Sequence, residues 1–187
     1  ATWRFGARMS WAKVPSSVRS YSVPDMDSKV FLEIKKKYRG LVNKRRTTLE
    51  LGEAYDFIET GVKPELQDYM NGQVLNELEY CLNLYDLEPK VYIAYDRLAY
   101  FEKGNDDLRI SFDTNIRTRR SDLLLESGDH GKRLLDSDVW LMEIKTSLAK
   151  PLWLCEMLSE FEIRSSSFSK YGTEYKNMMA RQKEMPK

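Results

Sequence analysis

The chain has 187 residues, of which 42% are apolar and 32% charged, and its formal net charge is +1. This composition excludes a disordered chain, and the balanced charge favours neither nucleic acid nor an acidic membrane as a partner. No stretch approaches about eighteen consecutive apolar residues, which excludes a membrane-spanning helix within these residues. With no signal-peptide pattern at the start, we expect one cytoplasmic domain over residues 1–187.

The histidine and cysteine content excludes several kinds of active site. A single histidine, His130, argues against a His-based catalytic triad and against a His-ligated zinc site. Cys81 and Cys155 both lie in apolar stretches with a helical pattern. We therefore interpret both cysteines as reduced core residues rather than as a disulfide or a metal site.

The first clear element in chain order is a strand over residues 29–37. Its apolar residues fall on one face because they alternate with charged ones, and they are Val30, Leu32 and Ile34. The dipeptide Arg39-Gly40 predicts a tight turn into a second strand over residues 41–49, so that the two strands form a hairpin.

Residues 52–85 have a helical pattern. We expect a short helix that ends at Gly61 and a longer helix that begins near Pro64, where a missing N–H costs nothing. The apolar stripe of the longer helix consists of Leu66, Tyr69, Met70, Val74, Leu75, Leu78, Cys81 and Leu82.

Strands return in the second half of the chain. Residues 91–101, 108–117 and 139–146 alternate or are rich in β-forming residues, and helices are expected after Pro151 and after Ser167. The pattern as a whole predicts an α+β fold of long antiparallel strands with helices before, between and after them.

The polar faces of these strands carry an excess of positive charge. The eight cations are Lys35, Lys37, Lys44, Arg46, Arg97, Arg109, Arg117 and Lys145, and the three carboxylates are Glu33, Asp113 and Glu143. One interpretation is an antiparallel sheet whose polar side faces water. The other is a surface for a chain of phosphates, because arginine forks suit phosphate oxygens and a carboxylate suits a divalent metal.

Five short motifs occur in the same order as in a known family. They are VFLEIKKKY at 30–38 followed by KRR at 44–46, YDRLAY at 95–100, LRISFD at 108–113, LMEIKT at 141–146 and SFSKYG at 167–172. In this respect the chain resembles the VTC domain over roughly residues 18–175. That resemblance implies a closed antiparallel β-barrel of about eight strands, a triphosphate tunnel, with flanking helices. It also implies a polyphosphate polymerase that transfers the γ-phosphate of ATP to a growing chain.

The resemblance also implies roles for individual residues. The side chains that would line the tunnel and bind the triphosphate and the growing chain are Lys35, Lys37, Lys44, Arg97 and Arg109. Further substrate contacts would come from Arg19 and Lys170. Strand parity adds Arg46 and Lys145 as further substrate-binding candidates. Glu143 would ligate Mn²⁺ or Mg²⁺, and the direct catalytic residues would be Lys35, Arg97, Arg109 and Glu143.

The sequence departs from the family pattern near its beginning. Ser17 stands where the family's basic strand has its first inward cation. Residues 1–17 are too few to hold both the family's N-terminal strand and its Tyr-Phe-Asp segment. We therefore expect part of the family's N-terminal region to be missing.

Two other functions stay open. The same site could hydrolyse triphosphates if water replaced the phosphate acceptor, or it could bind polyphosphate without turnover. Nucleic acid is not expected as a partner, because single-strand binders interleave aromatic residues with cations on an open face. The expected partners are ATP or another triphosphate and polyphosphate, and a membrane-associated partner stays possible.

Overall fold

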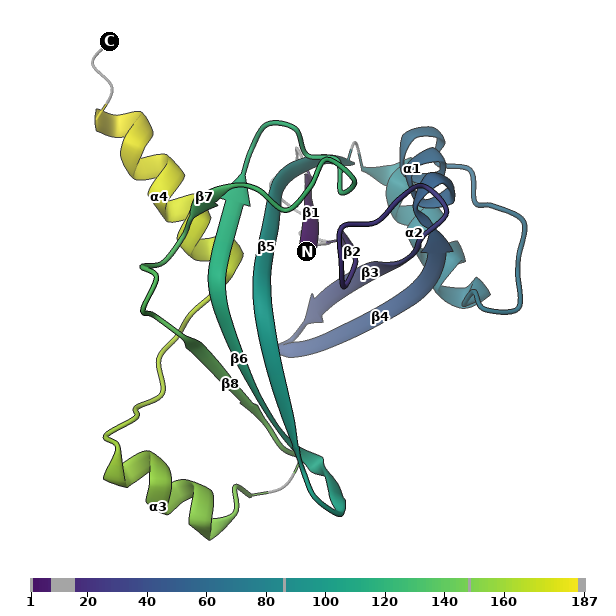
Figure 1. The fold of residues 1–187 in the computed structure, drawn as a ribbon. Helices are drawn as coiled ribbons and strands as arrows, with labels where there is room; N and C mark the ends of the chain where they lie inside the picture. Colours follow the sequence, from purple (N-terminus) through teal and green to yellow (C-terminus); the bar gives the residue numbers. More distant parts are fainter. Residues whose placement is uncertain (1, 8–15, 86, 148, 185–187) are drawn as a thin grey trace. The chain divides into compact units, whose positions relative to one another are not determined.

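The computed structural model describes residues 2–7, 16–85, 87–147 and 149–184 (Figure 1). For residues 2–7, 16, 37, 38, 105, 106 and 184 it describes the backbone only. The chain divides into two compact units. Unit 1 comprises Ala1–Ala94 and Arg117–Lys132, and unit 2 comprises Tyr95–Ile116 and Arg133–Lys187. Two long strands, β5 and β6, contribute one part to each unit.

The described residues form eight strands and four helices. The strands are β1 (Thr2–Ala7), β2 (Ser16–Arg19), β3 (Lys29–Tyr38), β4 (Leu41–Glu50), β5 (Leu87–Glu102), β6 (Asn105–Arg119), β7 (Lys132–Arg133) and β8 (Leu141–Lys145). The helices are α1 (Leu51–Thr60), α2 (Gly72–Leu84), α3 (Leu152–Glu160) and α4 (Lys170–Glu184). The α+β class predicted from the sequence is confirmed.

The expected closed barrel is wrong. The strands pair in the order β4-β3-β2-β1-β5-β6-β7, with β8 paired to β6, and no pairing among the described residues joins β4 to β7 or β8. A barrel needs the edge of its last strand to meet the edge of its first. Because β7 has 2 residues and β8 has 5, these strands offer only short edges for such a closure. The fold is therefore an open α+β arrangement.

The predicted hairpin is confirmed in unit 1. Strands β3 and β4 pair over their whole length, and the turn between them has positive φ at Arg39 (46°) and Gly40 (83°). Two successive positive φ angles define the turn type that matches the twist of a two-residue hairpin. The turn fixes the register, so Glu33 lies opposite Arg46 and Lys35 opposite Lys44.

The core of unit 1 lies between these strands and the helices α1 and α2. Figure 1 shows the two helices together over one face of β3 and β4. The core side chains from the strands are Val18, Val30, Leu32, Ile34, Leu49, Tyr92 and Ala94. Those from the helices are Leu51, Ala54, Phe57, Val74, Leu75, Leu78 and Cys81. The apolar face of β3 is thus buried as predicted, and its charged face points the other way.

The second helix begins later than predicted. Leu66 and Tyr69 have helical spacing but precede α2, which starts at Gly72, and both side chains are exposed. The Asn71 side chain accepts a hydrogen bond from the Val74 N–H and so caps the helix. This cap satisfies an N–H group that the helix leaves unpaired, which favours a start at that point.

Loss of this cap should destabilise the protein. We expect Asn71→Ala to lower the free energy of unfolding by about 1 kcal/mol. Asn76→Ala, at an exposed position inside the same helix, is the control. It removes an exposed hydrogen bond from Lys63 but gains helix propensity, so its effect should be close to neutral. Urea denaturation measures both variants, and equal losses would contradict the capping role.

Strand β1 lies in the region where the family's first strand was not recognised. Thr2–Ala7 pairs with both β2 and β5, and Arg4 lies opposite Ser17 in the register. Residues 8–15 lie outside the described part of the chain.

In unit 2 the polar face of β6 is buried. Ser111 and Asp113 are 2% and 1% exposed, whereas Phe112, on the apolar face between them, is half-buried. This is the opposite of a polar face turned to water. In α3, Leu154 is buried. Cys155 was expected in the core, but its side chain is exposed. Both cysteines are free thiols, as predicted.

Candidate functional site

The predicted site residues, together with the carboxylates Glu33 and Asp113 of the same strand faces, fall into two groups, one in each unit. The first, called the β3 cluster, consists of Arg19, Glu33, Lys35, Lys44 and Arg46. The second, called the β6 cluster, consists of Arg97, Arg109, Asp113, Glu143, Lys145 and Lys170. The side chain of Lys37 lies outside the described part of the structure, although its backbone pairs with Val42 in the hairpin.

The β3 cluster is built by strand alternation on three neighbouring strands. Glu33 lies opposite Arg46 on β4 and opposite Ser17 on β2. Residues that are direct partners in an antiparallel pair project to the same face. Arg19, two residues after Ser17, therefore shares this face, which is opposite to the core face of Val30 and Leu32.

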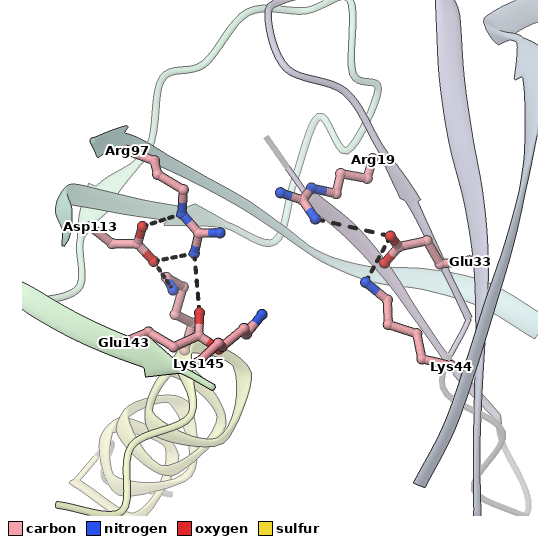
Figure 2. Close-up of polar contacts among 8 residues, drawn as sticks. Arg19, Glu33, Lys44, Arg97, Asp113, Glu143 and Lys145 are labelled. Atoms are coloured by element: carbon pink, nitrogen blue, oxygen red, sulfur yellow. Dashed lines mark hydrogen bonds and ion pairs between the residues drawn. The ribbon is translucent and has the colours of Figure 1, made fainter. Parts of the chain in front are cut away.

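A buried carboxylate organises the β3 cluster. Glu33 is 6% exposed, and its Oε1 atom lies 2.8 Å from the Lys44 Nζ and 4.0 Å from the Arg19 Nη1 (Figure 2). A charge removed from water in this way needs ionic partners. Glu33 thus holds two cations in place.

Two further cations of the β3 cluster have no carboxylate partner within the described residues. Lys35 is exposed, and Arg46 has its guanidinium carbon 4.6 Å from the centre of the Phe31 ring. The cluster therefore has four cations and one carboxylate. Such an excess attracts anions, because the cations repel one another until an anion neutralises them.

The opposite face of the same hairpin uses its cations structurally. Lys36 and Arg45 both bind Glu77 of α2, with the Lys36 Nζ 3.0 Å from Oε2. These contacts help to hold α2 against β4 and lower the pKa of Glu77 from its usual value, with the Lys36 hydrogen bond as the largest cause. Strand alternation places both cations on the face opposite to Glu33 and Lys35.

The β6 cluster is built on β5, β6, β8 and the first residue of α4. In the register, Ser111 lies opposite Glu143 and Arg109 opposite Lys145. The direct pairing brings these side chains to the face of β6 that carries Asp113. Lys170 begins α4 and reaches the same carboxylate.

Asp113 is the centre of the β6 cluster. The Arg97 Nε donates to Oδ1 at 2.6 Å and the Arg97 Nη2 donates to Oδ2 at 2.8 Å (Figure 2). The Lys170 Nζ also donates to Oδ2. Burial by itself would raise the pKa of Asp113, but the hydrogen bonds from Arg97 and Lys170 outweigh it and hold the pKa below its usual value. Asp113 is therefore an anion that orients two cations.

Glu143 has a different environment. Its side chain is 45% exposed, with Oε2 3.6 Å from the Arg97 Nη2 and Oε1 3.2 Å from the Lys145 Nζ. No group of three or more histidine, cysteine, aspartate or glutamate side chains in the described residues is arranged to hold a metal. Glu143 thus fits a divalent ion only as one ligand that shares it with phosphate oxygens and water, a mode that Mg²⁺ often adopts.

Aromatic rings support the cations of the β6 cluster. The centre of the Tyr95 ring lies 5.1 Å from the guanidinium carbon of Arg97 and 4.4 Å from the Lys170 Nζ. The guanidinium carbon of Arg109 lies 5.3 Å from the centre of the Phe101 ring, and its buried Nε has no hydrogen-bond partner in the described residues. Rings stabilise cations without using up their N–H donors, so these donors stay available to an anion.

Two residues outside the predicted substrate-binding and catalytic set also belong to this cluster. The sequence leaves Asp113 equally open as a group that orients Arg97 or Arg109 and as a metal contact, and the structure shows it bound to Arg97 and Lys170. Tyr95 is not predicted as a site residue. Both share strand parity with Arg109 or Arg97, which is the signal that could have indicated them. Arg117, predicted on the same face as Asp113, instead belongs to unit 1 and binds Asp129. A positive φ of 48° at Asn115 interrupts the alternation before it.

The VTC domain family model matches residues 13–179, which is most of the chain. The chain belongs to the VTC domain family. This membership links it to polyphosphate chemistry and to a family associated with polyphosphate polymerase activity. No curated protein sequence matches the chain. Among the described helices of this VTC domain, none is both long and apolar enough to cross a membrane.

The depressed pKa of Asp113 predicts a dependence of stability on pH. In the unfolded chain, Asp113 has a pKa of about 3.9. Just below that pH, Asp113 is protonated in the unfolded chain but still ionised in the folded protein. The contribution of Asp113 is therefore complete above that pH and is lost as pH falls through its lower folded pKa.

Urea denaturation of the wild type and of Asp113→Asn measures this contribution. The difference in unfolding free energy between the two proteins should be largest at neutral pH and should shrink as the pH is lowered below about 3.9. A difference that stays constant over this range would show that Asp113 does not titrate as an ion pair.

Proposed function

We propose that this VTC domain is a metal-dependent polyphosphate polymerase. A terminal oxygen of a polyphosphate chain attacks the γ-phosphorus of ATP, the bond from that phosphorus to the β–γ bridging oxygen breaks, and ADP leaves. The observation that carries this proposal is that, in both clusters, buried carboxylates hold cations that outnumber them. The chain also belongs to a family linked to polyphosphate.

The chemistry requires little more than positioning and charge neutralisation. Phosphoryl transfer spreads negative charge over the oxygens of the transferred group, and fixed cations stabilise that charge without reorganising during the reaction. Arg97 fits this role because Asp113 and Glu143 occupy only part of its donor set. In unit 2 we assign Arg97 and Arg109 to the transferred phosphate and Lys145 and Lys170 to the rest of the substrate. In unit 1 we assign Lys35, Arg19, Lys44 and Arg46 to phosphate groups of the substrate. Lys37 is assigned to substrate binding from its position in the sequence.

A divalent metal, Mn²⁺ or Mg²⁺, is part of the proposal. Glu143 would hold it together with phosphate oxygens, and its exposure leaves room for them. When bound, such an ion neutralises charge on phosphate oxygens and helps to align donor and acceptor. In the absence of a metal, Arg97 and Lys145 occupy the two oxygens of Glu143.

A second candidate function is polyphosphate binding without turnover. The observation that favours it is that Glu143 lies between two cations while the described residues offer no metal-binding group of three ligands. A protein of this kind would keep the affinity of the cations for phosphate and would not depend on a metal.

The products of ATP separate these functions. The purified chain is incubated with ATP and Mn²⁺, the products are resolved on a gel for long polyphosphate, and free phosphate is assayed. Long chains are the expected result. Free phosphate without chains would contradict the polymerase and indicate a triphosphatase, and neither product with tight polyphosphate binding would indicate a binding protein.

A further inference from the structure

The Asp113 carboxylate contacts cations from two different elements of unit 2. Arg97 comes from β5 and Lys170 from the first position of α4, and both donate to this one side chain on β6. We infer that Asp113 is a positioning residue that holds Arg97 and Lys170 as a fixed pair for binding adjacent phosphate oxygens. This inference rests on the proposed function, since it concerns how that site is set for transfer.

The donors of the two cations are only partly used by Asp113. Arginine has five N–H donors, and Asp113 accepts hydrogen bonds from two of them, the Nε–H and one N–H of Nη2. The Nη1 group of Arg97 makes no hydrogen bond within the described residues. Lysine has three donors, and one of those on Lys170 points to Oδ2. The pair can therefore bind phosphate while it stays bound to the carboxylate.

Because Asp113 is buried, it can hold the two cations without blocking the approach of an anion to them. Its side chain is 2% exposed, whereas those of Arg97 and Lys170 are 20% and 17% exposed. A phosphate that approaches from solvent reaches the two cations without having to displace the carboxylate. Glu143, at 45% exposed, differs in this respect, because an incoming phosphate or metal can separate it from Arg97.

The bidentate contact also fixes the direction of the Arg97 fork. Two parallel N–H···O bonds define the plane of the guanidinium, which a single contact would leave free to rotate. The ring of Tyr95 lies near both cations and limits their movement further. Misplacement of a catalytic cation by about 1 Å reduces turnover by on the order of 10²-fold.

The test is the variant Asp113→Asn, in which an amide of the same shape presents N–H donors to the cations instead of a second acceptor. We expect kcat to fall by on the order of 10²-fold. The affinity for tripolyphosphate should stay the same or increase, because the site has lost a negative charge. A structural role alone would not produce this split between turnover and binding.

Asp96→Asn is the matched control. Asp96 is exposed, adjacent to Arg97 in the chain and on the other strand parity. Its carboxylate accepts a hydrogen bond from the Asn115 side chain that an amide oxygen can also accept, and its replacement changes the net charge by the same amount. It should leave kcat and affinity within about two-fold of the wild type, as expected for a surface substitution. A kcat of Asp113→Asn within the same range, or a loss of affinity at unchanged kcat, would overturn the inference.

A measurement on the wild type keeps the inference testable if Asp113→Asn does not fold or if the wild type makes no polyphosphate. The Nε–H signal of Arg97 in a ¹⁵N NMR spectrum, assigned by Arg97→Lys, should exchange slowly with water and persist when tripolyphosphate is added. Fast exchange, or loss of the signal on addition of tripolyphosphate, would show that the carboxylate does not hold Arg97. Absence of polyphosphate synthesis by the wild type would instead contradict the proposed function.

Discussion

Glu143→Gln should abolish turnover and leave the binding of tripolyphosphate largely intact. The amide keeps the shape and the acceptor toward Arg97 but loses the negative charge that a divalent ion requires. Because a bound metal contributes several kcal/mol to phosphoryl transfer, the expected loss is on the order of 10³-fold or more. Binding should persist, since the variant retains every cation of the β6 cluster.

The control for this variant is Glu160→Gln, an exposed glutamate of α3 in the same unit. It should retain wild-type activity. Binding of Mn²⁺ in the presence of tripolyphosphate, followed by electron paramagnetic resonance, gives a readout besides turnover and should weaken in Glu143→Gln alone. Turnover by Glu143→Gln close to that of the wild type would remove Glu143 from the mechanism.

The double variant Lys35→Ala/Arg46→Ala should lower the affinity for polyphosphate by on the order of 10²-fold. Both cations lie on the face of Glu33, and neither has a carboxylate partner within the described residues, so the anion would be their main partner. A charge-assisted hydrogen bond contributes about 1.5 kcal/mol or more, and two such losses give an effect of this size. The affinity should also depend less steeply on salt concentration, because fewer counterions are released on binding.

The same hairpin offers a matched control for this variant. Lys36→Ala/Arg45→Ala changes the charge equally, one residue away on each strand, but removes the two partners of Glu77. It should lower stability and leave polyphosphate affinity within about two-fold of the wild type. Equal losses of affinity in the two double variants would show that binding depends on net charge and not on the β3 cluster.

The strand faces were the part of the fold that could be predicted from the sequence. Strict alternation around Leu32 and a two-residue turn at Arg39-Gly40 define the hairpin locally, so the register of Glu33 with Arg46 follows from sequence neighbours. The charged faces were therefore assigned correctly. Nothing local specifies which distant strand edges meet, which is why the closed barrel was wrong.

Other differences arise where two local signals compete. The apolar spacing of Leu66 and Tyr69 matches a helix, but the Asn71 side chain caps a helix that starts after them. In the β6 cluster, alternation indicated that Asp113 shares a face with Arg109 but not how deeply it is buried. Its contact with Lys170 depends on tertiary structure, since 57 residues separate the two in the chain.

The most direct test of polymerase activity is a phosphate balance for the purified chain with ATP and Mn²⁺. ADP, free phosphate and phosphate in acid-labile chains are measured in the same samples over time. A polymerase should release about one ADP for each phosphate added to a chain, with little free phosphate, because transfer moves one phosphoryl group per ATP. Release of ADP with an equal amount of free phosphate, or no consumption of ATP, would contradict polymerase activity.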